Sequence, residues 1–216
     1  GYRNVGLYLK RIVPTFPDVS KVLVTGSSAG GFGATYNFDR IAQAFCPRPA
    51  VLIDDSGPAM SDEYLAPCLQ TRWREVWGLD STLPAGCPEC TGTDGGGSVN
   101  YITYLGNRYP DSRMGLLSND KDSTIRLFYG FGENECANID GAIPLLMSGD
   151  KFAEGLTNLR DNLLSSSPVW GTYFVGGAGH TFLGGGAYTS TEVESVPLTE
   201  WVAAIVDGDT SINVGP

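Results

Sequence analysis

Four short apolar runs along the chain are typical of strands that are buried on both faces. Each run is bounded by turn residues. The four runs are KVLVTG (21–26), AVLIDDSG (50–57), RMGLLSN (113–119) and GTYFVGG (171–177). Strands that are covered on both faces occur mainly in parallel sheets, so the pattern predicts a mostly parallel sheet.

Segments with apolar residues at helical spacing separate these runs and close the chain. The expected helices cover residues 32–45, 63–79, 150–164 and 197–206. Residues 1–13 also look like the middle of an amphipathic helix. Alternating strands and helices predict an α/β protein. At 216 residues, the expected organisation is one domain over residues 1–216 with a core of its own.

The net charge limits the classes of partner that we expect the protein to bind. The formal net charge is −10 and the pI is near 4.4, which disfavours binding to nucleic acid or to an anionic membrane surface. No stretch approaches the ~20 apolar residues of a membrane-spanning helix, so we expect no membrane span.

The cysteines indicate an oxidising compartment. They are Cys46, Cys68, Cys87, Cys90 and Cys136. Five cysteines in an acidic chain with few lysines are typical of a secreted protein with disulfides, and the odd number leaves one thiol over or one partner outside the chain. A redox or zinc role for CPEC (87–90) is disfavoured, because no thioredoxin-like context and no second CxxC motif accompany it.

The stretch GSSAG, from Gly26 to Gly30, fits the G-x-S-x-G pattern with Ser28 at its centre. In α/β-hydrolases this pattern forms a sharp turn between a strand and a helix that exposes the serine hydroxyl. The pattern alone is weak, and an ordinary glycine turn is the alternative. Here an expected strand precedes it and an expected helix follows it, so Ser28 is the candidate nucleophile. We expect both flanking glycines to be required because side chains there would clash.

A serine hydroxyl needs a base to take its proton, and the chain has one histidine, His180. His180 follows the buried run at 171–177, where α/β-hydrolases place the base. Without that context, a histidine with a purely structural role would be the better interpretation.

The third member of such a triad is an acid in the segment after the run at 113–119. Asp122, followed by a serine at an expected helix start, is favoured over the neighbouring Asp120, and Glu133 or Glu135 are more distant rivals. The order Ser, Asp, His along the chain is the order of α/β-hydrolases.

Two further features lie close to this set in the expected fold. Asp54 and Asp55 end the second strand at the same edge of the sheet, where they either shape a pocket or cap a turn. Trp73 and Trp77 lie on one expected helix, either as a lid over an acyl pocket or, more commonly, as part of the core.

The stretches VLVTGSSAGGFGATYNFDRIA, LIDDSGP, LLSNDKDS and GHTFL together resemble the pectin acetylesterase/Notum family of carboxylesterases, over about residues 5–205. The resemblance implies an extracellular, disulfide-bonded α/β-hydrolase in which Ser28 is the nucleophile, Asp122 the acid and His180 the base. It implies no cofactor and no metal.

The family also implies a substantial N-terminal part, with further strands and a glycine-rich loop that supplies oxyanion-hole amides. Of those donors, only the amide of Ala29 is present here. We therefore expect residues 1–216 to be the C-terminal part of a longer enzyme, with an N-terminal segment of the same precursor bound to it.

The expected activity is hydrolysis of an acyl ester, with a short acyl group on a carbohydrate such as pectin as the first choice of substrate. A lipase or polyesterase that uses the same triad is the alternative enzyme. A non-catalytic binding module on a hydrolase scaffold is the alternative from another class, and the intact Ser, Asp and His set disfavours it.

Overall fold

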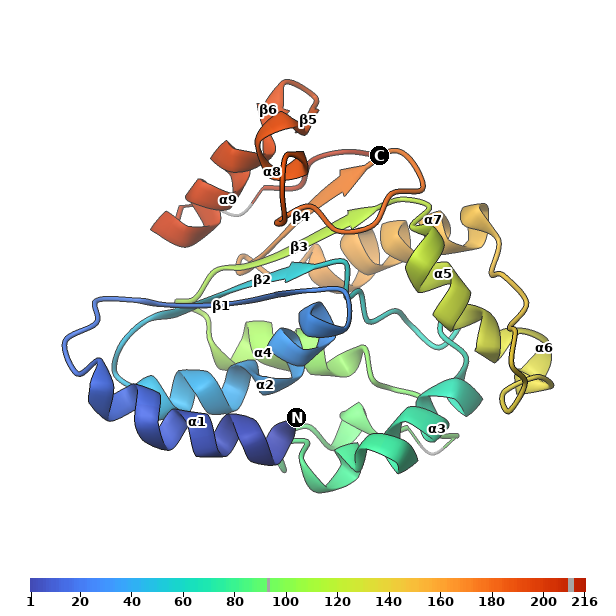
Figure 1. Cartoon of the computed structure of the whole chain (residues 1–216), viewed down its shortest axis with the longest axis horizontal. Coiled ribbons are helices and arrows are strands. Elements are labelled where there is room, and N and C mark those ends of the chain that lie inside the picture. The colour runs from blue at the N-terminus through green and yellow to red at the C-terminus, as the bar shows by residue number, and fades with distance from the viewer. Residues whose placement is uncertain (93, 210–211) are drawn as a thin grey trace.

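The computed structural model describes residues 1–92, 94–209 and 212–216. Within these residues, a parallel sheet has the strand order β1-β2-β3-β4 (Figure 1). The strands are β1 (Val22–Ser27), β2 (Ala50–Asp55), β3 (Met114–Asn119) and β4 (Trp170–Val175). Each predicted apolar run forms a strand, which confirms the α/β fold class.

Helices connect these strands. Their bounds are α1 (Tyr2–Thr15), α2 (Ala29–Phe45), α3 (Pro67–Trp77), α4 (Asn100–Arg108), α5 (Ser123–Tyr129), α6 (Glu133–Cys136), α7 (Gly149–Asn158), α8 (Ala187–Ser190) and α9 (Leu198–Asp207). A π-helix, Leu159–Leu164, continues α7, and two short strands, β5 (Glu192–Val193) and β6 (Val196–Pro197), pair antiparallel. None of the helices in the described ranges is long and apolar enough to cross a membrane.

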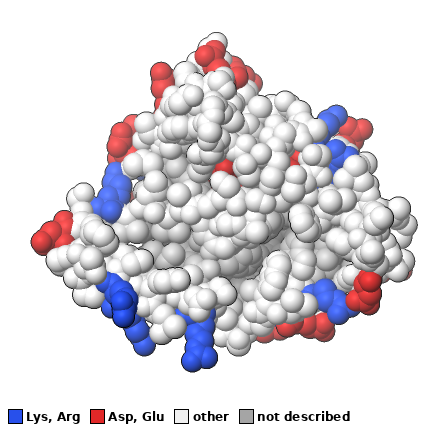
Figure 2. Space-filling view, in the orientation of Figure 1, with Lys and Arg blue, Asp and Glu red and all other residues white. Residues whose placement is uncertain are grey.

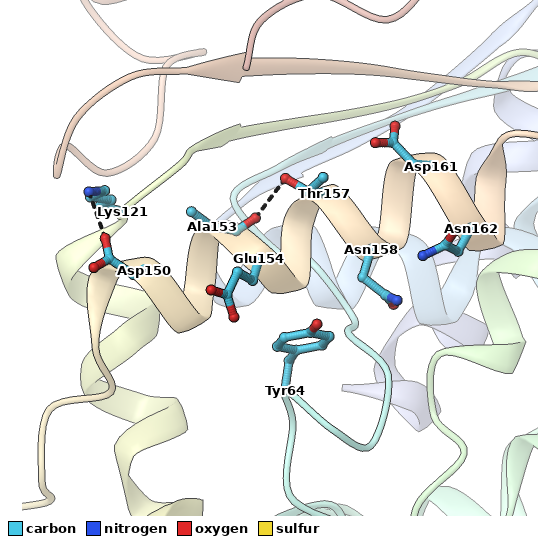
Figure 3. A pocket seen from close by; sticks show the side chains of 9 residues that line it. All are labelled: Tyr64, Lys121, Asp150, Ala153, Glu154, Thr157, Asn158, Asp161 and Asn162. Carbon is cyan, nitrogen blue, oxygen red and sulfur yellow. Dashed lines mark hydrogen bonds and ion pairs between the residues drawn. The ribbon is translucent and has the colours of Figure 1, made fainter.

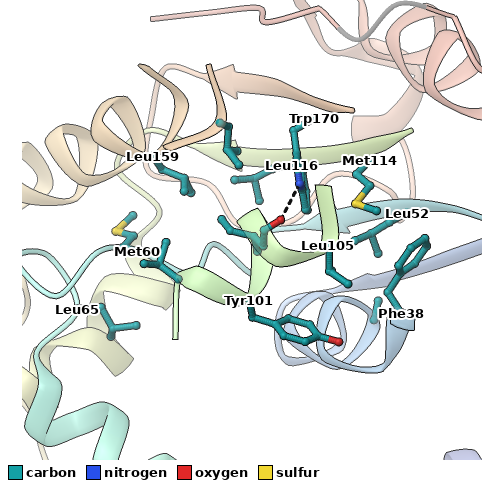
Figure 4. Close-up of a cluster of buried hydrophobic side chains, with 14 of the residues drawn as sticks. Phe38, Leu52, Met60, Leu65, Tyr101, Leu105, Met114, Leu116, Leu159 and Trp170 are labelled. Carbon is teal, nitrogen blue, oxygen red and sulfur yellow. Dashed lines mark hydrogen bonds between the residues drawn. The ribbon is translucent and has the colours of Figure 1, made fainter. Parts of the chain in front are cut away.

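The sheet has a core on each face. Helix α9 lies on one side with α8, and α1, α2 and α4 lie on the other (Figure 1). Successive side chains of a strand point to opposite faces, so Leu116 joins the core beneath α2 and α4, whereas Leu117 joins the core beneath α9. Figure 4 shows the larger core, in which the indole N–H of Trp170 donates to the carbonyl of Ile102 at 3.0 Å.

The register of the sheet brings the ends of the strands together. Ser27 of β1 lies beside Asp55 of β2, and Asn119 of β3 lies beside Val175 of β4. Strands β1 to β4 run in the same direction, so the loops that follow them leave one edge of this sheet. That edge is the usual location of a site in an open α/β sheet.

Two disulfides confirm the expectation of a disulfide-bonded protein. Cys68 of α3 is bonded to Cys136 of α6, and Cys87 is bonded to Cys90. Cys46 is exposed and forms no disulfide within the described part of the chain.

Candidate active site

Ser28 lies at the junction of β1 and α2 with φ of 61° and ψ of −125°. A positive φ is uncommon for a residue other than glycine and marks a sharp, strained turn. The backbone N–H of Ser28 donates to the carbonyl of Asp55 at 2.7 Å, and its carbonyl accepts from Gly31 N at 2.8 Å. The turn is therefore held from both sides, as the sequence pattern predicts.

The structure changes the explanation of the glycines around this turn. A Cβ atom on Gly26 would lie 2.1 Å from the carbonyl oxygen of Gly30, so only glycine fits at Gly26. A Cβ on Gly30 would meet nothing within 4 Å, and the expectation of a clash there is wrong. The second tight position is Gly31, where a Cβ would lie 2.3 Å from Asp54 Oδ1.

His180 and Asp122 form a close pair. His180 Nδ1 lies 2.7 Å from Asp122 Oδ2, and the Asp122 side chain is fully buried whereas that of His180 is 21% exposed. The other carboxylate oxygen of Asp122 caps α5, where it accepts from the backbone N–H groups of Thr124 at 2.9 Å and Ile125 at 3.0 Å. These two amides fix the carboxylate, and the carboxylate in turn orients the imidazole.

The rival acids are held elsewhere. Asp120 accepts from the backbone N–H of Gly177 at 2.7 Å. Glu133 is paired with Lys151 at 2.7 Å, and Glu135 is exposed. The structure thus brings Asp122, and none of its rivals, to the histidine.

The Ser28 hydroxyl makes no hydrogen bond to His180 among the described residues. Serine and histidine side chains at such sites are often loosely aligned before a substrate binds. The loop after His180 is tied to the end of β2, where Phe182 N and Leu183 N donate to Asp55 Oδ2 at 2.9 and 3.0 Å. The carbonyl of Asp55 also accepts from the Ser28 backbone N–H. One residue, Asp55, therefore contacts both the turn at Ser28 and the loop after His180.

A cavity of about 640 Å³ opens beside Ser28. Aromatic side chains dominate its wall: Phe32, Tyr36, Trp73, Trp77, Phe128 and Tyr129. Figure 2 shows the hollow on a face whose charged side chains gather mostly at the rim. Ala29, the first residue of α2, also lines the cavity, and its N–H belongs to the first helical turn, whose N–H groups have no intrahelical partner.

The two tryptophans of α3 are wall residues. Trp73 and Trp77 stack with ring centroids 5.5 Å apart, and Trp77 is 56% exposed. Trp73 also meets Phe32 edge to face at 6.1 Å. Burial raises the pKa of Tyr36 to about 12, so its hydroxyl is neutral at physiological pH.

Asp54 and Asp55 are both buried and neither lines this cavity. Burial raises the pKa of Asp54 to about 7, because removing the carboxylate from water penalises its charged form. Thr35 donates to one oxygen of Asp54 at 2.7 Å. Asp55 acts on the loop after the histidine, a role that the sequence pattern left open.

A second hollow, of about 600 Å³, runs along α7 and contains none of the three candidate catalytic residues (Figure 3). Lys121 and Asp150 form a 2.9 Å ion pair at one end, and Tyr64 faces the helix. No group of three metal-ligating side chains is close enough to hold a metal ion in the residues that the structure describes.

Comparison with known proteins supports the fold. No family model and no curated protein matches the chain. Two crystal forms of the Wnt deacylase Notum from Drosophila superpose on it, with TM-scores of 0.54 and 0.53 at 16% and 18% sequence identity. Each comparison covers 93% of this chain but 58% and 59% of the Notum chain. The chain thus has a Notum-like α/β-hydrolase fold and spans less than two thirds of the length of those proteins.

Proposed function

We propose that this chain carries the catalytic centre of a serine carboxylesterase. The observation that carries the proposal is the buried Asp122 paired with His180 at the same sheet edge as a strained serine turn. That combination provides a nucleophile, a base and a group that orients the base, which is the minimum for nucleophilic ester hydrolysis.

The proposed reaction has two steps. In the first, His180 takes the proton of Ser28, whose Oγ attacks the ester carbonyl; the bond to the alcohol breaks, and the imidazolium returns the proton to that alcohol. In the second, His180 deprotonates a water molecule that attacks the acyl-serine, which releases the carboxylic acid and restores Ser28. Asp122 holds the imidazole orientation and stabilises the imidazolium in both steps.

The oxyanion that forms in each step needs N–H donors. The Ala29 amide, at the N-terminus of α2, supplies one, and the positive end of the helix dipole favours the negative charge. One such donor contributes on the order of 3 kcal/mol to the stability of the transition state. A second donor from a preceding segment of the same precursor stays a prediction.

The volume and lining of the cavity indicate which size of acyl group it would hold. The sequence favours a short acyl ester on a carbohydrate such as pectin as substrate. However, a cavity of about 640 Å³ with aromatic side chains along much of its wall is far larger than an acetyl group fills. We therefore add a second candidate, a longer or aromatic acyl ester, which would bury apolar surface against Trp73 and Trp77.

The location of the protein is also part of this proposal. The disulfides Cys68–Cys136 and Cys87–Cys90 favour an extracellular location, because such bonds persist in oxidising compartments. A non-catalytic binding module is the alternative class, and any turnover that depends on Ser28 would exclude it.

A series of nitrophenyl esters from acetyl to long-chain acyl, assayed beside acetylated pectin, tests the function. We expect hydrolysis that Ser28→Ala abolishes, together with one fluorophosphonate label on Ser28. A preference for acetyl would support the carbohydrate ester, whereas a preference for longer chains would support the second candidate. Turnover or labelling that survives in Ser28→Ala would contradict the proposal.

A further inference from the structure

We infer that Asp55 is a positioning residue that sets the place of His180 relative to Ser28. The inference rests on the proposed function for its kinetic consequences and on the contacts of Asp55 for its geometry. Asp55 touches neither the cavity nor the imidazole, so it acts through the two segments that carry the reacting groups.

The first segment is the nucleophile turn. The carbonyl of Asp55 accepts from the backbone N–H of Ser28 at 2.7 Å, and its Oδ2 accepts from the hydroxyl of Ser27 at 2.7 Å. Asp55 also lies beside Ser27 in the register of the parallel sheet. Its backbone and side chain therefore hold the same turn at two points.

The second segment is the loop after the base. Phe182 N donates to both carboxylate oxygens of Asp55, at 3.1 and 2.9 Å, and Leu183 N donates to Oδ2 at 3.0 Å. Asp55 is 0% exposed, so water does not replace these bonds. An acceptor that is lost here leaves buried N–H groups without partners, which is costly.

Backbone strain shows that this anchor constrains the loop. Thr181, directly after His180, has φ of 62°, and Ser56, directly after Asp55, has φ of 67°. A β-branched residue at positive φ is a genuine outlier and persists only where its surroundings hold it. Thr181 N donates to Ser56 Oγ at 3.2 Å, and Ser56 Oγ donates to Asp55 Oδ1 at 3.1 Å. The anchor therefore reaches to within one residue of the base.

A carboxylate suits this task better than an amide. Its two oxygens accept from four donor groups in the described structure: the hydroxyls of Ser27 and Ser56 and the amides of Phe182 and Leu183. In Asp55→Asn, an NH₂ group takes the place of one oxygen and faces at least one of these donors, whichever way the amide turns.

Asp54 offers a matched control on the same strand. It is buried like Asp55, but it contacts α2 through Thr35 and has no bond to the loop after His180. Burial raises its pKa to about 7, which favours the neutral carboxyl compared with an ordinary aspartate, and Asp54→Asn places a neutral group of similar volume at the same position. Asp54→Asn therefore controls for the loss of a buried carboxylate without touching the loop.

The test uses kinetics on a nitrophenyl ester and the NMR signals of the imidazole, which need no assignment because the chain has one histidine. A displacement of about 1 Å at a reacting group costs about a hundredfold in rate. We expect kcat to fall about a hundredfold in Asp55→Ala and about tenfold in Asp55→Asn, with KM nearly unchanged and shifted imidazole signals. Asp54→Asn should match the wild type in kcat and in these signals.

If Asp55→Ala does not fold, Asp55→Asn, which keeps the side-chain volume, still tests whether Asp55 positions His180. A folded Asp55→Asn with wild-type kcat and imidazole signals would overturn the inference. Equal changes of kcat and of the imidazole signals in Asp54→Asn would also overturn it. The NMR measurement needs no turnover, so a wild-type protein that is inactive on every ester would contradict the proposed function and still leave the positioning of His180 open to test.

Discussion

Asp122 uses its two carboxylate oxygens for two different tasks. Oδ1 accepts two backbone N–H groups at the start of α5, and Oδ2 meets His180 Nδ1 at 2.7 Å. An acidic N-cap stabilises a helix both by hydrogen bonding and through the helix dipole. The fold of α5 and the orientation of the imidazole therefore depend on one side chain.

These tasks are separable by mutation. Asparagine caps a helix about as well as aspartate, so Asp122→Asn should keep the melting temperature close to that of the wild type. It should lower kcat on a nitrophenyl ester by about 10³- to 10⁴-fold, because an amide no longer stabilises the imidazolium and favours the wrong tautomer.

Asp120→Asn is the matched control. Asp120 accepts from Gly177 N, and an asparagine carbonyl can accept the same bond. We expect kcat within about threefold of the wild type. If Asp120→Asn abolished turnover and Asp122→Asn did not, the acid would be Asp120.

At the scale of elements, helix α3 is the part of the cavity wall that a disulfide attaches to another helix. It carries Trp73 and Trp77, and the disulfide from Cys68 to Cys136 ties its first turn to α6 across 68 residues of sequence. A cross-link of that span removes entropy from the unfolded chain worth about 4 kcal/mol in the loop-closure model.

The double variant Cys68→Ser/Cys136→Ser tests this link. We expect the free energy of unfolding to fall by about 4 kcal/mol in urea titrations. KM for longer acyl esters should rise more than KM for acetyl esters, because α3 forms the far wall of the cavity. The variant Cys46→Ser, at the exposed unpaired cysteine, should change neither quantity. Unchanged stability in the double variant would show that this disulfide does not constrain α3.

The elements that the sequence predicted are those with a strong local pattern. Each strand of the sheet is an uninterrupted apolar run, and α2, α7 and α9 show clear helical spacing. Helix α4 (Asn100–Arg108), of nine residues, was not predicted, and of α5 (Ser123–Tyr129), of seven residues, only the start after Asp122 was expected. The turn at Ser28 was predictable because the motif and the flanking elements are contiguous in sequence.

The contacts of Asp55 were beyond prediction for a different physical reason. Its bonds to Phe182 join residues 127 positions apart, and no local pattern encodes which backbone N–H groups a distant carboxylate will meet. The same holds for the cavity wall, which combines α2, α3 and α5. The sequence therefore predicted the candidate residues Ser28, Asp122 and His180, whereas the fold alone revealed the contacts that hold their segments together.

At the scale of the whole molecule, one side of the sheet lacks cover. Among the described strands, β1 pairs with β2 and with no other strand, and its Leu23 is 47% exposed. Helix α1, which lies beside α2, buries none of its residues. An exposed edge with unpaired backbone groups and apolar side chains is a template for pairing with another chain.

We expect the 216-residue chain, purified alone, to self-associate through this edge as its concentration rises, as measured by analytical ultracentrifugation. Leu23→Lys should raise the monomer fraction, because an edge lysine opposes strand pairing. Ile143→Lys, at a residue that is 78% exposed on the segment before α7, is the control and should have little effect. Equal effects of the two variants would show that the edge is not the contact. The expectation that a preceding segment of the same precursor covers β1 makes a different prediction. Intact-mass analysis of material from the native source, with and without reductant, should show a second piece or an uncleaved longer chain. The sedimentation of that material should not depend on concentration.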